Sequence, residues 1–230
     1  MIITIDGPTA SGKSTIARLV ADQLGIYYLN SGLLYRALAY VLRTKAGYST
    51  ATITQPQQKD VVTYLDQKKL RYRYSKESGA RIIFEGNDIT EYLKQGDIDE
   101  YASLVSTNPY VRNMVDAMQR TLASQHDFVA DGRDTGSVVF PQAGIKFYLT
   151  ASIPVRAQRW LQAQSKKDLN YSFDQAVTEI TTRDERDKNR SVAPLIIPEG
   201  AQIVDSSELS ISQTVSVFLN YIYDKKKGRD

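Results

Sequence analysis

Short runs of β-branched and other apolar residues alternate along the chain with longer segments in which apolar residues recur every three or four positions. The short runs are typical of buried strands, and the longer segments are typical of amphipathic helices. Alternating strands and helices predict an α/β fold, with a parallel sheet and helices on both faces. The pattern predicts strands near residues 2–5, 26–29, 128–130, 145–149 and 203–205, and helices near 16–24, 33–43, 109–122, 154–163, 173–188 and 210–223.

The pattern changes between about residues 46 and 99. Polar, loop-like sequence there surrounds the runs 70–74 and 81–85, which are separated by a turn and predict a small antiparallel sheet inserted into the α/β frame. The alternation of arginine and tyrosine over 71–74 fits aromatic stacking on nucleic acid. It also fits a strand with one polar and one packed face, and we favour this second interpretation because it is the commonest strand pattern.

Residues 7–15 lie between the first predicted strand and the first predicted helix, and they read G-x-x-x-x-G-K-S, the phosphate-binding loop pattern. Gly7 and Gly12 allow the backbone to turn its N–H groups toward an anion, and the helix N-terminus adds partial positive charge. Lys13 is expected to reach the β- and γ-phosphates of ATP, and Ser14 is expected to bind Mg²⁺. The predicted ATP-binding residues are Gly7, Pro8, Thr9, Ala10, Ser11, Gly12, Lys13, Ser14 and Thr15.

Composition narrows the function classes. The 230 residues are 42% hydrophobic and 24% charged, which is ordinary for a globular protein of one large or two small domains. A net charge of +3 is too small to indicate a nucleic-acid or membrane surface. The sequence contains no cysteine, which excludes disulfides, thiolate metal sites and a cysteine nucleophile.

The sequence predicts a cytoplasmic protein. The chain starts almost directly with its first strand, which leaves no room for a signal peptide. No apolar run approaches the ~18 residues of a membrane span. The one histidine, His126, lies in a polar turn and is expected to be a surface residue rather than a catalyst.

The predicted strand 128–130 is followed by Asp131-Gly132-Arg133-Asp134. An acid at this position is placed to hold Mg²⁺ or its waters, so Asp131 is a candidate metal ligand. Arg133 can bind a phosphate through two parallel hydrogen bonds. Asp134 can accept from an exocyclic amine, and a carboxylate favours the N4 amine of cytosine over the O4 oxygen of uracil.

The helix predicted over 173–188 ends in a run of charges. At about 100° per residue, Arg183, Asp187 and Arg190 fall within roughly 60° of one another, so one face carries two guanidinium groups around a carboxylate. Such a face suits phosphoryl transfer, because arginines neutralise phosphate charge without competing as nucleophiles. Ion pairs on an ordinary solvated helix explain the spacing equally well.

Ligands of open parallel sheets bind outside the carboxyl ends of the strands. The phosphate-binding loop, Asn30-Ser31, residues 131–134 and Asp205 all follow or end predicted strands. We therefore expect these segments to share one cleft.

Several motifs in this order resemble the bacterial cytidylate kinases over nearly the whole chain. The stretches that carry the resemblance are IDGPTASGKST, LNSGLLYRA, ADGRDTGSVVFP, FYLTAS, RDERDKNRSVAPL and IVDSSELSI. The resemblance implies the nucleoside monophosphate kinase fold and transfer of the γ-phosphate of ATP to CMP or dCMP, with Mg²⁺ as the cofactor. It implies a core formed by residues 1–40, 104–155 and 172–230, a monophosphate-binding insert over 41–103, and a lid over 156–171.

The resemblance also implies individual roles. Lys13, Arg36, Arg133 and Arg190 would be catalytic, and the three arginines would hold the CMP phosphate. Cytosine would be contacted by Ser103, Arg112 and Asp134, the ribose by Arg183 and Asp187, and the nucleotide by Ser31. Arg156 and Arg159 resemble the arginines that neutralise phosphate charge near the lid. Asn30 stands where many family members have Asp, which weakens any electrostatic role of that position.

The mechanism implied is direct in-line transfer without a general base, and lid closure would exclude water. The small-molecule partners would be ATP and CMP or dCMP, and we expect a monomer that binds neither nucleic acid nor a membrane. A kinase of the same fold for UMP or another small phosphorylated acceptor is the alternative enzyme. A nucleotide-dependent switch or a nucleic-acid-binding ATPase is the alternative from another class.

Overall fold

The computed structural model describes residues 1–94, 97–165 and 169–227. The chain divides into two compact units, one formed by Met1–Tyr28 with Asp127–Asp230 and the other by Leu29–His126. Residues 166–168 of the predicted lid, 95–96 of the predicted insert and 228–230 of the predicted core lie outside the described residues.

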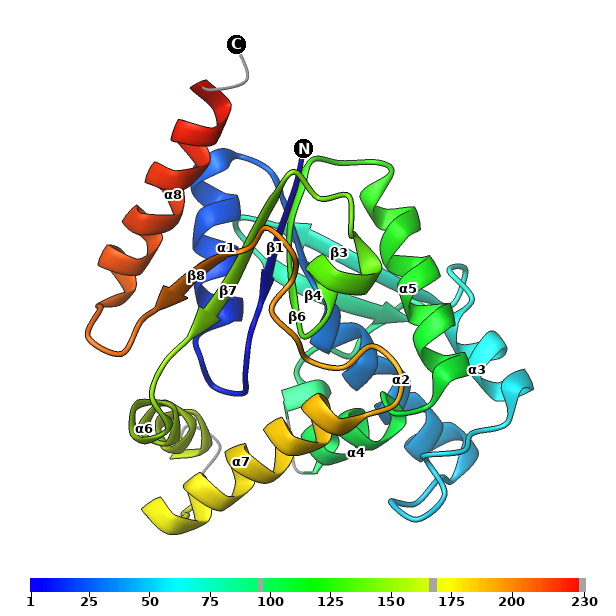
Figure 1. The fold of residues 1–230 in the computed structure, drawn as a ribbon. Helices are drawn as coiled ribbons and strands as arrows, with labels where there is room; N and C mark the ends of the chain where they lie inside the picture. The colour runs from blue at the N-terminus through cyan, green and yellow to red at the C-terminus, as the bar shows by residue number, and fades with distance from the viewer. Residues whose placement is uncertain (95–96, 166–168, 228–230) are drawn as a thin grey trace. The chain divides into compact units, whose positions relative to one another are not determined.

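The first unit is organised around a parallel sheet (Figure 1). Strand β1 pairs in parallel with β6 and β7, and β7 pairs in parallel with β8. Ile5 of β1 is level with Asp131 of β6 and Phe147 of β7, so the carboxyl ends of these strands meet at one edge. The order across the sheet is β2 (Tyr27–Asn30), β6 (Phe128–Gly132), β1 (Ile2–Asp6), β7 (Ile145–Thr150) and β8 (Gln202–Asp205).

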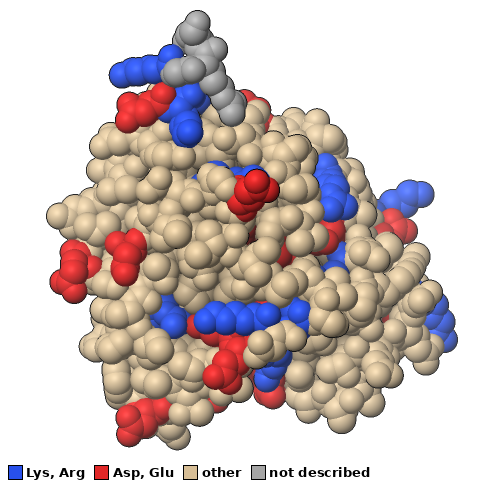
Figure 2. All heavy atoms as spheres, viewed as in Figure 1, with Lys and Arg blue, Asp and Glu red and all other residues tan. Residues whose placement is uncertain are grey.

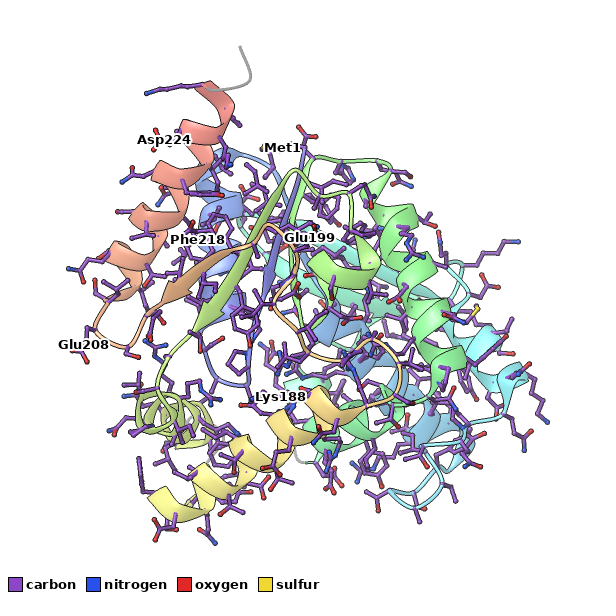
Figure 3. All side chains as sticks on the ribbon, in the orientation of Figure 1. Met1, Lys188, Glu199, Glu208, Phe218 and Asp224 are labelled. Atoms are coloured by element: carbon purple, nitrogen blue, oxygen red, sulfur yellow. The ribbon has the colours of Figure 1, made fainter. Side chains whose placement is uncertain are left out.

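Helices α1 (Lys13–Leu24) and α8 (Ile211–Lys227) pack side by side on one face of this sheet (Figure 1). The aliphatic face of α1 is buried, and Phe218 of α8 points toward β7, where its ring stacks on Phe147 at 4.0 Å between centroids (Figure 3). The turn Thr135–Val139 lies against β1 and β6. Burial of these apolar side chains supplies the main favourable free energy of the unit.

Helices α6 (Ile153–Ser165) and α7 (Phe173–Asn189) lie beyond the carboxyl ends of the strands and pack against each other (Figure 1). Their shared core contains Ala157, Ala176 and Ile180. Helix α7 begins with a capping box, because the Ser172 hydroxyl accepts from the Gln175 amide and the Gln175 side chain accepts from the Ser172 amide.

The second unit combines helices with a small antiparallel sheet. Strand β3 pairs with β4 along its whole length, and β4 pairs with β5. Leu70 and Tyr72 are buried whereas Arg71 and Arg73 are exposed, so β3 has the packed face and the polar face that we favoured. The elements are α2 (Ser31–Ala46), α3 (Gln58–Leu65), β3 (Leu70–Ser75), β4 (Gly79–Phe84), β5 (Asn87–Asp88), the 3-10 turn η1 (Tyr92–Lys94), α4 (Ile98–Val105) and α5 (Pro109–Ala123).

The predicted fold class is confirmed: a parallel sheet with helices, and a separate antiparallel sheet. The pattern did not predict α3 and α4, because each helix has only eight residues, too few for a helical period to stand out. Helix α8 extends through Lys225–Lys227, past the end predicted near residue 223. Cations at a helix C-terminus interact favourably with its dipole and allow the helix to extend.

Among the residues that the structure describes, no helix has both the length and the apolar character needed to cross a membrane.

Candidate active site

The phosphate-binding loop connects β1 to α1 in the predicted position. Gly7 has φ of +150°, and a Cβ added to it would lie 2.1 Å from the backbone oxygen of Leu149 at the end of β7. Gly12 caps α1 in the left-handed region with φ of +94°. Both positions require glycine, one for close backbone approach and the other for its dihedral angles.

The Lys13 side chain is buried against its own loop. Its Nζ donates to the backbone oxygen of Pro8 at 2.5 Å and to the Ser11 hydroxyl at 3.2 Å. Burial, followed by the nearby positive charge of Arg133, holds the pKa of Lys13 well below its usual value. A desolvated ammonium group inside the loop is available to pair with an anionic ligand, which would compensate its burial.

Asp131, near the end of β6, lies beside the first turn of α1. The Ser14 hydroxyl donates to its Oδ2 at 2.7 Å, and the Tyr28 hydroxyl donates to its Oδ1 at 2.7 Å. Burial raises the pKa of Asp131, although both hydrogen bonds and the charge of Lys13 oppose the rise. The Ser14 hydroxyl and the Asp131 carboxylate are oxygen ligands of the kind that Mg²⁺ prefers, and Mg²⁺ sites for nucleotides have few protein ligands.

Among the described residues, no group of three or more His, Cys, Asp or Glu side chains is arranged to hold a metal ion. Ser14 and Asp131 are the residues that would hold Mg²⁺ in this unit, and nucleotide phosphates and water would complete its coordination.

Asp6 is a buried carboxylate that our sequence reasoning did not single out. Its Oδ1 accepts from the Thr135 amide at 2.8 Å and the Thr135 hydroxyl at 2.7 Å, and its Oδ2 accepts from the Gly136 amide at 2.7 Å. Burial raises the pKa of Asp6 to about 6, although the hydrogen bonds oppose the rise. The side chain anchors the turn that follows Arg133 and Asp134 to the end of β1.

Arg133, Asp134, Asp187 and Arg190 form one charged cluster, defined here as the arginine–carboxylate cluster. Arg133 Nε donates to Asp187 Oδ2 at 2.8 Å. Arg190 approaches Asp187 Oδ1 at 3.8 Å and Asp134 Oδ1 at 3.3 Å. The cluster brings the end of β6 to the last turn of α7, the region marked by Lys188 in Figure 3.

The electrostatics of this cluster favour an ionised carboxylate at Asp187. Burial alone would raise its pKa, but the charges of Arg133, Arg183 and Arg190 outweigh burial and lower the pKa below its usual value. Arg183 and Asp187 lie on one face of α7 as predicted, but Arg190 follows the end of that helix in extended backbone. The three charges are nevertheless electrostatically coupled and not isolated in solvent.

Arg156 and Arg159, predicted near the lid, lie on α6. The Arg156 guanidinium is buried and forms an ion pair with Asp184 at 2.5 Å, and it also donates to the backbone oxygens of Thr9 and Ala151. Arg159 donates to the backbone oxygen of Ser11 at 3.1 Å and to Ser206. Both arginines contact the phosphate-binding loop through its backbone, and their predicted role toward phosphate stays a prediction.

The remaining predicted residues belong to the second unit. Arg36, on the second turn of α2, donates from Nε to Asp99 at 2.7 Å. Arg112 is fully buried in α5, where it donates to the Ser106 backbone oxygen at 3.1 Å and lies over the Tyr35 ring at 5.4 Å. Two further predicted residues, Ser31 at the start of α2 and Ser103 on α4, are buried.

Asn30 caps α2, since its Oδ1 accepts from the Leu33 amide at 2.9 Å. The amide oxygen of Asn30 therefore provides the helix cap that an aspartate carboxylate would also provide at this position.

Charges of both signs also meet on the surface. On the face drawn in Figure 2, Lys and Arg side chains lie interspersed with Asp and Glu side chains. This arrangement agrees with the net charge of +3.

A family model described as cytidylate kinase matches residues 3–224. The chain belongs to the cytidylate kinase family. A cytidylate kinase of Colwellia psychrerythraea is 36% identical over 224 residues, which cover 97% of this chain and 96% of that protein. A cytidylate kinase of Marinomonas sp. is 39% identical over 216 residues, covering 94% and 92% of the two chains. The resemblance predicted from the motifs is confirmed.

The fold also has a likeness among solved structures. An uncharacterised protein from Eubacterium ventriosum has a TM-score of 0.54 at 11% identity, with 96% of this chain and 98% of that chain covered. This likeness concerns the fold alone.

Three polar residues of the first unit were not predicted to serve the site: Asp6, Tyr28 and Asp184. Asp6 carried a signal, because it is the last residue of a buried strand and directly precedes the phosphate-binding loop. Asp184 also carried one, since it lies three residues before Asp187 and both are buried on the same helix. Nothing in the local sequence marks Tyr28, whose hydroxyl reaches Asp131 only through sheet pairing.

Proposed function

We propose that this protein transfers the γ-phosphate of ATP to CMP or dCMP and releases ADP with CDP or dCDP. The observation that carries the proposal is the contact between Arg133 and the phosphate-binding loop. Arg133 Nη2 donates to the Thr9 hydroxyl at 3.2 Å, so a guanidinium group of the arginine–carboxylate cluster lies directly beside the loop. An arginine in this position suits two phosphates that must meet end to end.

On the donor side, Lys13 and the loop amides bind the ATP phosphates, except for the Thr9 amide, which donates to Asp184. The Ser14 hydroxyl and the Asp131 carboxylate would hold Mg²⁺, because they offer two hard oxygen ligands 2.7 Å apart. The ion would supply positive charge that neutralises the phosphate oxygens.

On the acceptor side, Arg36, Arg133 and Arg190 bind the CMP phosphate. In the structure these arginines pair with carboxylates: Arg133 with Asp187, Arg190 with Asp134, and Arg36 with Asp99. Binding of the CMP dianion would replace part of this pairing. The remaining assignments are Ser103, Arg112 and Asp134 to cytosine, Arg183 and Asp187 to the ribose, and Ser31 to the nucleotide. Residues 41–103 form the monophosphate-binding insert, and residues 156–171, with Arg156 and Arg159, form the lid.

The transfer is a direct in-line displacement. An oxygen of the CMP phosphate attacks the γ-phosphorus of ATP, a new P–O bond forms, and the bond to the β–γ bridging oxygen breaks. The attacking oxygen is already anionic near neutral pH, so no general base is required. The protein contributes position and charge neutralisation, and closure of the lid excludes water that would hydrolyse ATP.

An acceptor panel tests the proposal. ADP formation is measured with ATP and Mg²⁺ and one of CMP, dCMP, UMP or AMP, and kcat/KM is expected to be highest for CMP or dCMP. Best turnover with AMP or UMP would contradict the proposed acceptor. A cytoplasmic location and a monomeric state, with no binding to nucleic acid or membranes, stay predictions.

A further inference from the structure

Thr9 lies between three segments of the first unit, and each of its polar groups contacts one of them. Its amide donates to Asp184 Oδ1 on α7 at 2.7 Å. Its backbone oxygen accepts from Arg156 Nη1 on α6 at 2.9 Å. Its side-chain hydroxyl accepts from Arg133 Nη2 at 3.2 Å, and the whole residue is only 6% exposed.

Arg156 and Asp184, which bind the Thr9 backbone, also bind each other. Arg156 and Asp184 are both buried and form an ion pair at 2.5 Å, and Arg156 Nε donates to the Ala151 backbone oxygen at 3.0 Å. Buried charges joined in this way are expensive to separate, because each would remain unpaired in a low-dielectric environment. The pair therefore fixes the orientation of the Thr9 peptide groups.

Because of these contacts, the polar groups of Thr9 differ in use from the groups of the loop that are proposed to contact phosphate. Its N–H donates to the Asp184 carboxylate, so the amide is used within the protein and not for a phosphate. The Thr9 hydroxyl accepts from Arg133 Nη2, and Arg133 Nε donates at the same time to Asp187 at 2.8 Å. Two hydrogen bonds on different nitrogens of a planar guanidinium group define its orientation.

We propose that Thr9 is a positioning residue that orients Arg133 toward the acceptor phosphate, and that the Arg156–Asp184 ion pair holds Thr9 for this task. The inference rests on the proposed function, because it assigns Thr9 to the acceptor side of the same reaction. The phosphate-binding loop then sets the position of both phosphates: its backbone and Lys13 bind the donor, and its third residue aligns an arginine for the acceptor. Small errors in such alignment have large effects on rate.

Two matched pairs of variants test the role of the hydroxyl. The first pair compares the wild type with Thr9→Val, which lacks the hydroxyl oxygen and keeps the branched shape. The second pair compares Thr9→Ser, which keeps the hydroxyl, with Thr9→Ala, which lacks it. In both pairs we expect loss of the oxygen to lower kcat/KM for CMP by about tenfold. The KM for ATP is expected to stay within about twofold, and the melting temperature of the Val variant should remain close to that of the wild type.

A double-mutant cycle with Arg133→Lys tests the route of the effect. Because Thr9 acts through the Arg133 guanidinium, Thr9→Val should have little further effect on kcat/KM for CMP in the Arg133→Lys background. Additive effects would overturn the inference. So would an unchanged kcat/KM for CMP in both oxygen-free variants, or an equal loss of ATP affinity, which would place Thr9 on the donor side.

The wild-type protein in the same assay separates this inference from the proposed function. If the wild type fails to phosphorylate CMP or dCMP, the proposed function is wrong and the inference falls with it. If the wild type is active and the Thr9 variants match it, only the inference is wrong.

Discussion

Arg133 and Asp187, 54 residues apart in the sequence, are joined by a hydrogen-bonded ion pair of 2.8 Å between Nε and Oδ2. Asp187 also faces the charges of Arg183 and Arg190. The protein thus holds the arginines that we propose to bind the acceptor phosphate around a carboxylate. Their mutual repulsion is reduced, and their orientation is largely fixed in advance.

Asp187→Asn removes the negative charge from this cluster. At neutral pH we expect the free energy of unfolding to fall by about 3 kcal/mol, because the arginines then face one another without a counter-charge. The folded-state pKa of Asp187 is lowered, so its stabilisation is complete above the usual value of 3.8 and is lost as the pH falls through the lower folded-state pKa. Urea denaturation at several pH values checks this.

The difference in unfolding free energy between the wild type and Asp187→Asn should therefore stay constant between pH 5 and 7. It should narrow only below about pH 3.8. Glu185→Gln is the matched control, since Glu185 is exposed on the same helix. A gap that widens toward acid pH would contradict the electrostatic account of Asp187.

Lys13→Met removes the ammonium group proposed to bind the ATP phosphates. We expect kcat to fall by about two to three orders of magnitude, as for the loss of a group that stabilises transition-state charge. Folding should survive, because burial already disfavours the charged lysine and an apolar side chain of similar length can fill its place. Steady-state kinetics and thermal melting measure the two effects, with exposed Lys45→Met as control. Near-normal turnover would remove Lys13 from the mechanism.

Asp134→Ala tests base reading. A carboxylate accepts from the N4 amine of cytosine but repels the O4 oxygen of uracil. We expect the ratio of kcat/KM for CMP to that for UMP to fall by about tenfold or more. Asp134→Asn should shift the ratio further toward UMP, because its amide group can donate to O4. An unchanged ratio in both variants would show that another residue selects the base.

Asp6→Asn tests the anchor beneath the 134–136 turn. At about pH 4 the variant should be less stable than the wild type by about 1–3 kcal/mol, because the amide nitrogen cannot accept the hydrogen bond from Gly136. The folded-state pKa of about 6 exceeds the usual 3.8, so ionisation of Asp6 destabilises the wild type progressively as the pH rises across this window. The Asn variant lacks this effect.

The difference in unfolding free energy between wild type and Asp6→Asn should therefore shrink from pH 4 to pH 6 and remain constant above it. A difference that stays constant or grows across this window would show that the folded-state pKa of Asp6 is not raised.

The sequence by itself determined the phosphate-binding loop, the strand–helix alternation and the family. These are local features: Gly7 to Ser14 form a motif of contiguous residues, and the 3.6- and 2-residue periods reflect which side chains are buried. It also placed Arg183 and Asp187 on one helix face, because helical geometry relates residues that are near in sequence. Arg190, expected on the same face, follows the end of α7 in extended backbone. The short helices α3 and α4 were missed, since tertiary packing and not local pattern stabilises them.

Only the tertiary structure decided which partner each charged group has. Asp6 with the Gly136 amide, Tyr28 with Asp131, and the Arg156–Asp184 pair with Thr9 each join residues more than 25 positions apart. No local period encodes such contacts, because they depend on strand order and on how α6 and α7 pack at the carboxyl ends of the strands. The sequence thus specified the chemical groups of the site, and the fold specified which of them bind one another.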